Sequence, residues 1–364
     1  MNVLSLFDGC SGGQQALERS GFKVGNYFAS EIDKYAIKVT MANYPNTVQL
    51  GSVIDVDGYK LPKIDLLIGG SPCQSFSFAG KRKGMSTKDE QEILTLDHYL
   101  QLKSEGFEFE GQSYLFWEYM RILNEVNPKY FLLENVMMGE KWEKILSKAI
   151  GVNPIMINSS LVSAQNRQRL YWTNIGMQPG GLFGDLESII EQPKDKGILL
   201  KDILESEVDE KYFLSQKMIN GFERHKERHK EKGTGFGYIP KNENDKGNAL
   251  RANAALAPTD NMLIIRKVIQ LSNYNRSNGG TQPFQQDRIY DIDGISPSLQ
   301  GQLSGGSHMI NTNKIRRLTP IECERLQTVK DNYTNHVSDS QRYKMLGNGW
   351  TVDVIAHIFK YIKL

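Results

Sequence analysis

Short apolar runs alternate with helical patterns along the first half of the chain. Candidate strands are Val3–Phe7, Asn26–Ser30, Thr47–Leu50, Ile64–Ile68, Tyr130–Glu134 and Pro154–Asn158. The segments between them with helical periodicity are Gln14–Ser20, Lys34–Asn43, Leu115–Asn127 and Glu140–Ile150. Alternation of this kind predicts an α/β fold with a doubly wound, mostly parallel sheet. In such sheets ligands gather beyond the carboxyl ends of the strands.

The pattern changes after about residue 176. A run of mixed charge, Arg224–Lys232, is expected to be a solvated face. Two faintly similar segments, Asn248–Ile265 and Ser296–Ile310, are expected to form short strands in paired hairpins. Helical periodicity returns at Ile321–Gln327 and from Ser338 onwards. We therefore expect a first domain at 1–178, an irregular, β-rich insert at 179–311, and a segment at 312–364 that completes the first domain.

Composition narrows the class of protein. With 364 residues, 39% hydrophobic and 24% charged, the chain has an ordinary globular composition, which argues against disorder. The net charge is only +2, so any site for a polyanion must be a local patch. Cys10, Cys73 and Cys323 lie far apart, without zinc or disulfide spacing, which suits a reducing compartment. No apolar stretch approaches the roughly 20 residues that span a bilayer. Because the first strand starts near Asn2, no signal peptide is expected, and the expected location is the cytoplasm.

One cysteine stands at the end of a predicted buried strand. The stretch GGSPCQSFS, residues 69–77, places Cys73 directly after a proline. A free cysteine is usually a small buried hydrophobe. A thiolate at a junction between strand and loop is also well placed to act as a nucleophile.

A glycine-rich turn follows the first strand. LFDGCSGG, residues 6–13, opens a helix, and Glu31 ends the next strand about 20 residues later, the spacing at which a carboxylate binds ribose hydroxyls in nucleotide folds. An ordinary tight turn is the alternative. Because Ser11 and Gln14 interrupt the dinucleotide fingerprint, a nucleoside cofactor other than NAD is favoured.

Four further stretches appear in a recognisable order. They are FLLENV at 131–136, AQNRQRLYW at 164–172, RRLTPIECERLQ at 316–327 and LGNGWTV at 346–352. Together with the glycine turn and SPCQSFS, they resemble the motifs of the cytosine-5 DNA methyltransferase family, of bacterial or phage type and similar in style to the animal de novo enzymes. The resemblance covers the first half and the last fifty residues. It implies a Rossmann-like methyltransferase sheet with a smaller, inserted target-recognition domain.

The resemblance also assigns catalytic roles. Cys73 would add to carbon 6 of a flipped-out cytosine, which activates carbon 5 for methylation. Glu134 would support ring nitrogen 3; its alternative role is a helix-capping carboxylate. Arg167 and Arg169 match a Gln-x-Arg-x-Arg pattern that begins at Gln165, and Arg169 is expected to contact the base. The alternative places one of the two arginines on a solvated edge.

The implied methyl donor is S-adenosylmethionine. The residues that correspond to its binding site are Phe7, Asp8, Gly9, Gly12, Glu31, Ile32, Ser52, Val53, Leu115, Asn348 and Gly349. Ser52 stands where the family usually has an aspartate for the adenine, and Asp55 could substitute. A polar stretch at 89–111 has no assigned function; an added helix is expected there.

The implied partner is double-stranded DNA, without a membrane or a metal. Lys81, Arg82 and Lys83 are candidates for phosphate contacts, and Asn273–Arg276 and Gln282–Arg288 for base contacts. The default assembly is a monomer, and a separately encoded restriction endonuclease is a further candidate partner. Two alternatives stay open: a transfer-RNA cytosine-5 methyltransferase and a catalytically silent DNA-binding relative.

Overall fold

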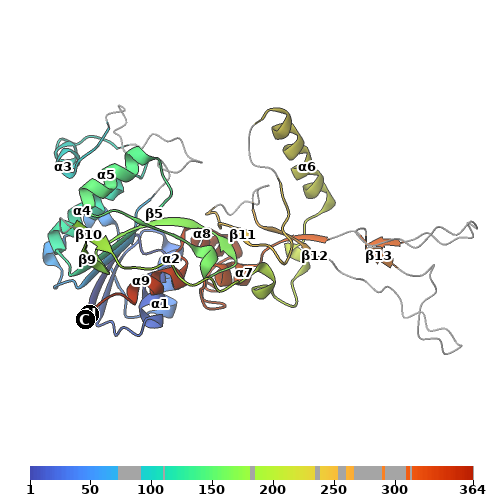
Figure 1. Cartoon of the computed structure of the whole chain (residues 1–364), viewed down its shortest axis with the longest axis horizontal. Coiled ribbons are helices and arrows are strands. Elements are labelled where there is room, and N and C mark those ends of the chain that lie inside the picture. Colours follow the sequence, from blue (N-terminus) through green and yellow to red (C-terminus); the bar gives the residue numbers. More distant parts are fainter. Residues whose placement is uncertain are drawn as a thin grey trace, which may run out of the picture. The chain divides into compact units, whose positions relative to one another are not determined.

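The chain folds into two compact units. The computed structural model describes residues 1–72, 92–109, 111–180, 185–233, 238–252, 260–265, 289–291, 309–311 and 314–363 (Figure 1). The first unit comprises Met1–Ile203, Lys246–Ala255 and Pro320–Leu364, and the second comprises Leu204–Asp245 and Leu256–Thr319. The three domains expected from the sequence are functional assignments and stay a prediction. The segment Lys246–Ala255, which we call the strap, belongs to the first unit although the expected insert surrounds it.

A seven-stranded sheet forms the centre of the first unit. Its order is β3-β2-β1-β4-β5-β8-β6. The strands are β1 (Asn2–Leu6), β2 (Asn26–Ser30), β3 (Val48–Gln49), β4 (Leu66–Gly70), β5 (Tyr130–Val136), β6 (Ile155–Asn158) and β8 (Gln168–Thr173). β1 to β5 run parallel, whereas β8 is antiparallel to both β5 and β6. The chain order reverses between β1 and β4, the switch point beside which ligands bind in doubly wound sheets. The predicted α/β fold is confirmed.

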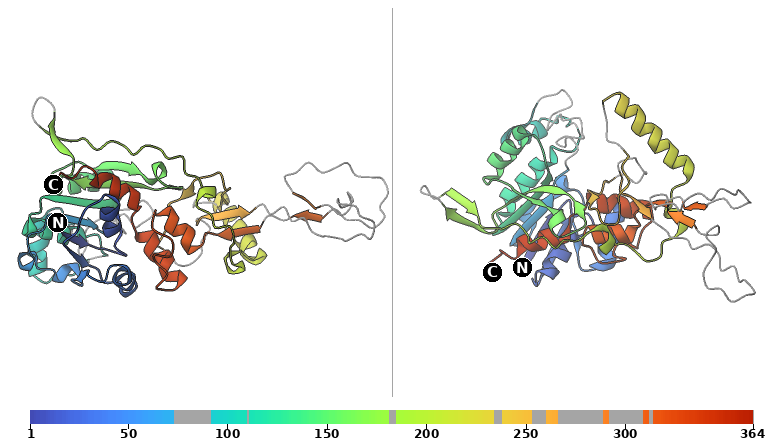
Figure 2. Two further views of the ribbon diagram at one scale, coloured as in Figure 1. Left: turned by 90° about the horizontal axis from the view of Figure 1, so that it is seen from below. Right: turned by 45° about the vertical axis from the view of Figure 1, so that its right-hand side comes forward.

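The helices of the first unit occupy both faces of this sheet. They are α1 (Gly12–Arg19), α2 (Lys34–Asn43), α3 (Leu96–Ser104), α4 (Leu115–Val126), α5 (Glu140–Ile150), α7 (Pro320–Leu326), α8 (Asp339–Asn348) and α9 (Val352–Phe359). Figures 1 and 2 show α4 and α5 on one face and the α1–α9 pair on the other. The expected extra helix is present as α3. The continuous helical pattern predicted after Ser338 is wrong in one respect, because the turn Gly349–Thr351 separates α8 from α9.

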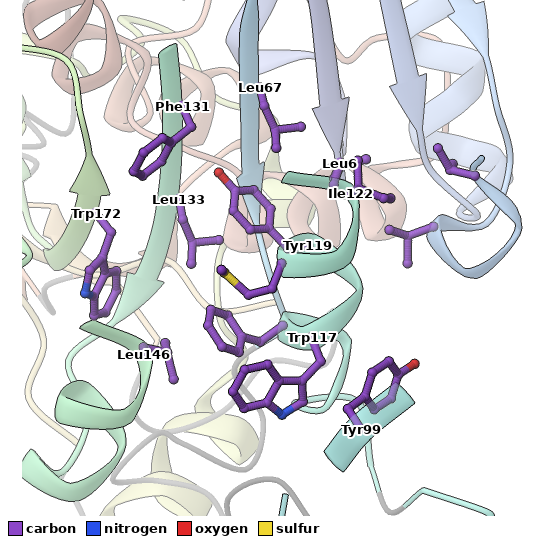
Figure 3. Packing of buried hydrophobic residues seen from close by; sticks show 14 of the residues in the cluster. Leu6, Leu67, Tyr99, Trp117, Tyr119, Ile122, Phe131, Leu133, Leu146 and Trp172 are labelled. Atoms are coloured by element: carbon purple, nitrogen blue, oxygen red, sulfur yellow. The ribbon is translucent and has the colours of Figure 1, made fainter. Parts of the chain in front are cut away.

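The main hydrophobic core lies between the sheet and α4. Figure 3 shows Tyr119 of α4 between Leu67 and Leu133 of the strands, with Trp117 of the same helix beside Tyr99. Full burial of each large apolar side chain stabilises the fold by roughly 1.5–3 kcal/mol. The buried residues of α4 are Phe116, Trp117, Glu118, Tyr119, Met120 and Ile122, so most of its first two turns lie in the core.

A buried ionic network connects α3 and α4 to the loop after β3, which contains Ser52 and Val53 of the expected methyl-donor site. The Glu118 side chain is fully buried and pairs with Lys103 of α3 at 2.5 Å and with Arg121 at 2.7 Å. Arg121 also donates to the carbonyl oxygens of Val53 and Val56, at 3.2 and 3.0 Å. The loop after β3 is thereby fixed to α4.

The second unit contains short strands and one long helix. β12 (Met262–Ile265) pairs antiparallel with β15 (Lys314–Arg317), and β13 (Ile289–Asp291) pairs parallel with β14 (Met309–Asn311). Residues 253–259 and 296–308 of the two similar segments lie outside the described residues, so the paired hairpins stay a prediction. Helix α6 (Gln216–Glu231) carries the charged run and buries no side chain, which confirms a solvated face. Among the described residues, no helix has the length and apolar character needed to cross a membrane.

Candidate active site at the carboxyl edge of the sheet

The ends of β4 and β5 bring the first predicted catalytic elements together. Gly70 of β4 is in register with Glu134 of β5. Ser71 and Pro72 continue from β4, and the next residue in sequence, Cys73, lies outside the described residues. Asn135 donates from Nδ2 to Ser71 Oγ at 3.1 Å and to the Ser71 carbonyl at 3.3 Å. The amide of Asn135 thus holds the backbone that leads to Cys73.

The Glu134 carboxylate is buried and bound at both oxygens. Arg169 Nε lies 2.9 Å from Oε1, and the indole Nε1 of Trp350 donates to Oε2 at 3.2 Å. Glu134 is 9% exposed and lies within β5, so it caps no helix. Burial, together with the nearby Glu134 charge, raises the pKa of Tyr171 above its usual range. The carboxylate is therefore largely shielded from solvent, with one cation and one neutral donor at its two oxygens.

Arg167, the first arginine of the pattern, has different surroundings from Arg169. Arg167 is 3% exposed, and its guanidinium donates to the carbonyls of Leu250 at 3.1 Å, Gly347 at 3.2 Å and Gly349 at 3.0 Å. These carbonyls belong to the strap, to the last turn of α8 and to the residue that follows α8. Neither arginine lies on a solvated edge. Arg169 faces Glu134, whereas Arg167 holds backbone together.

The glycine turn adopts a backbone that non-glycine residues rarely take. φ is +57° at Phe7, +58° at Gly9 and +58° at Ser11. Left-handed conformations at non-glycine residues cost of order 1–3 kcal/mol and cluster at functional sites. Asp8 accepts hydrogen bonds from the Tyr27 hydroxyl at 2.8 Å and from the Ser11 hydroxyl. Desolvation is the main cause that raises the pKa of Asp8 to about 6.

Glu31 connects this turn to the end of β2. Its Oε2 accepts from the amide of Gly9 at 2.8 Å, and its Oε1 accepts from the amides of Ile32 at 2.7 Å and Asp33 at 2.8 Å. The neighbouring Ile32 side chain is 72% exposed. An exposed apolar side chain beside a positioned carboxylate suits a nucleoside, which has one flat apolar face and polar ribose hydroxyls.

The other residues that the sequence assigns to the methyl donor lie in the loop after β3 and at the ends of two helices. Ser52 Oγ accepts from the amide of Ile54 at 3.3 Å, while Val53 is buried. Leu115 is half-buried at the start of α4, and Asn348 is exposed at the end of α8. In the described ranges, no group of three or more histidine, cysteine or carboxylate residues is arranged to hold a metal ion.

Sequence reasoning did not single out Trp350. Its signal was present, since it is a large aromatic residue directly after Gly349 in LGNGWTV. Lys81–Lys83, Asn273–Arg276 and Gln282–Arg288 lie outside the described residues.

Comparison with known proteins identifies the family. The family model described as "C-5 cytosine-specific DNA methylase" matches residues 1–364. The chain is 29% identical to "Type II methyltransferase M1.ScrFI" of Lactococcus lactis subsp. cremoris, over 97% of this chain and 75% of that protein. It is 27% identical to "Orphan methyltransferase M.SPRI" of Bacillus phage SPR, over 99% and 97% of the two chains.

Solved structures support the fold. The Entamoeba histolytica methyltransferase EhMeth matches with a TM-score of 0.63 and 15% identity, covering 99% of this chain and 97% of that chain. A Spodoptera frugiperda DNMT2 mutant matches with a TM-score of 0.59 and 21% identity, covering 99% and 98%. On the evidence of the family match over its whole length, this chain belongs to the C-5 cytosine-specific DNA methylases and is a DNA cytosine-5-methyltransferase.

Proposed function

We propose that this enzyme transfers the methyl group of S-adenosylmethionine to carbon 5 of a cytosine in duplex DNA, with Cys73 as the covalent nucleophile. The observation that carries the proposal is the Glu134 carboxylate, bound by Arg169 and aligned with Gly70, three residues before Cys73 in sequence. The target base must leave the duplex to reach such a buried edge, so base flipping is part of the proposal.

The residues at the carboxyl edge of the sheet suit the individual steps of cytosine methylation. The Cys73 thiolate forms a bond to carbon 6, and the electron pair displaced from the 5,6 double bond makes carbon 5 nucleophilic. Negative charge then builds up towards ring nitrogen 3, to which Glu134 donates a proton or a hydrogen bond from the protonated form of its carboxyl group. Arg169 is within reach of Glu134 and would stabilise the same charge. After methyl transfer, a base such as a water molecule takes the carbon 5 proton, and the electron pair of that C–H bond re-forms the 5,6 double bond and expels the thiolate of Cys73.

The residues beyond β1 and β2 fit the methyl donor. Bound there, S-adenosylmethionine would supply an electrophilic methyl group. A carboxylate offers about four lone-pair directions. Glu31 uses three of them for backbone amides, which leaves capacity for a ribose hydroxyl. Ile32 would cover the adenine face. The left-handed turn at Phe7–Gly9 and the residues Gly12, Ser52, Val53, Leu115, Asn348 and Gly349 would complete the site.

The insert would choose the target sequence. Residues 179–311 are the proposed target-recognition domain, and Lys81–Lys83 the proposed phosphate contacts. The functional form is proposed to be a monomer that needs no metal.

A covalent trap tests the reaction. Duplex DNA with 5-fluorocytosine at the target, incubated with S-adenosylmethionine, should form a denaturation-resistant complex, because the fluorine at carbon 5 cannot leave as a proton does. We expect the complex with the wild type and with Cys323→Ala, which removes a buried cysteine of α7, and none with Cys73→Ala. The target sequence is found beforehand by bisulfite sequencing of a methylation-free bacterial host that expresses the protein.

The outcomes separate the alternatives. A complex formed by Cys73→Ala would overturn the assignment of the nucleophile. Methylation of transfer RNA without methylation of DNA would favour the RNA enzyme. Folded protein that binds duplex DNA but methylates neither substrate would favour the silent relative.

A further inference from the structure

Trp350 lies between the glycine turn and the catalytic carboxylate. It follows α8 after Gly349, and its indole N–H donates to Glu134 Oε2 at 3.2 Å. A Cβ atom at Gly70 would lie 3.0 Å from the indole nitrogen, and one at Gly12 would lie 3.8 Å from Trp350 Cβ. The absence of a side chain at Gly70 thus makes room for the indole at the end of β4, whereas the distance at Gly12 is an ordinary van der Waals contact with the start of α1.

The backbone on either side of Trp350 is anchored by buried polar groups. The Gly349 carbonyl accepts from Arg167 at 3.0 Å and from Gln327 Nε2 at 3.2 Å. The Thr351 hydroxyl donates to Gln327 Oε1 at 2.8 Å and accepts from the Ser159 hydroxyl at 2.8 Å. Trp350 is therefore held in one place by its neighbours, and its N–H is a fixed donor.

Arg169 and Trp350 each bind a different oxygen of the Glu134 carboxylate. Arg169 binds Oε1 and Trp350 binds Oε2, so rotation of the carboxylate about its terminal bond would break both interactions. An indole N–H can only donate. It adds no charge, so it orients the carboxylate without competing with Arg169 as a counter-ion. When this group is protonated, its fixed plane presents the same O–H to ring nitrogen 3 in each encounter.

We propose that Trp350 is a positioning residue for Glu134, which fixes the plane of the catalytic carboxylate through its indole N–H. This inference rests on the proposed function of Glu134 in cytosine methylation. Because the Cβ atom of Trp350 lies near Gly12 and its indole nitrogen near Gly70, Trp350 connects the glycine turn with the carboxylate.

A double-mutant cycle tests the inference on the intact enzyme. Trp350→Phe keeps the ring and removes the N–H, and we expect the single-turnover rate of methyl transfer to fall by about 10- to 100-fold, the range for a lost hydrogen bond to a charged group. The KM for S-adenosylmethionine and the affinity for duplex DNA should change by less than about threefold, since the ring is retained. In a Glu134→Ala background, where no acceptor remains, the same change should have almost no further effect.

A control variant and two contradicting outcomes complete the test of Trp350. Trp172→Phe removes an indole N–H that donates to Ser147 Oγ at 2.9 Å in the core, and it should lower the unfolding temperature without lowering the rate. A wild-type rate in Trp350→Phe, or an equal loss in the Glu134→Ala background, would overturn the positioning role. If Glu134→Ala alone leaves the rate unchanged, the proposed function of Glu134 fails instead.

Discussion

Replacement of Arg167 by methionine should destabilise the enzyme far more than the loss of a surface arginine. Three carbonyl oxygens, of Leu250, Gly347 and Gly349, accept from this guanidinium at 3.0–3.2 Å. A hydrogen bond from a charged donor contributes about 1.5–3 kcal/mol, and an abandoned buried carbonyl costs about 1–3 kcal/mol. The variant also removes the desolvation cost of a buried cation, and methionine refills part of the volume. The net loss should be about 3–5 kcal/mol.

Thermal and urea unfolding, followed by tryptophan fluorescence, measure this loss. With about 2.1 cal/mol/K of unfolding entropy per residue over 364 residues, a loss of about 3–5 kcal/mol lowers the unfolding temperature by about 4–7 °C. Arg19→Met removes a partly exposed ion pair to Asp353 and should cost less than about 1 kcal/mol. Arg167→Lys should recover little, since an ammonium cannot reproduce the planar fork. An Arg167→Met protein as stable as Arg19→Met would refute the structural role of this guanidinium.

Two further predictions concern the glycine turn and the strap. The pKa of Asp8 is raised from 3.8 to about 6, so the folded state holds this proton more tightly and ionisation destabilises it. The stability of the wild type relative to Asp8→Asn should therefore fall by up to about 3 kcal/mol as the pH rises from 4 to 7 in urea titrations, and parallel pH profiles would contradict this. In Gly347→Ala, the new Cβ would lie 2.1 Å from the Arg251 carbonyl oxygen, so we expect a loss of about 1–3 kcal/mol and faster proteolysis within the strap. Gly221→Ala in α6, where nothing lies within 4 Å of the new Cβ, is the control, and equal proteolysis of the two variants would contradict the close approach.

Local patterns in the sequence determined most of the central fold. Apolar runs predicted six strands of the sheet, and helical periodicity predicted α2 and α5 with the observed bounds. Both signals work because burial of one face imposes a period on neighbouring residues. The order of the motifs also identified the family that the comparison confirms.

Long-range contacts decided the rest. The sequence did not predict that β8 runs antiparallel between β5 and β6, because strand partners far apart in the chain leave no local period. Arg167 and Arg169 are two residues apart in one motif, yet the first binds carbonyls of the strap and of the end of α8, whereas the second faces Glu134. Trp350 reaches Glu134 across 216 positions of sequence. A pattern can show that a side chain is buried, but only the folded chain brings together the distant groups that decide what the side chain does there.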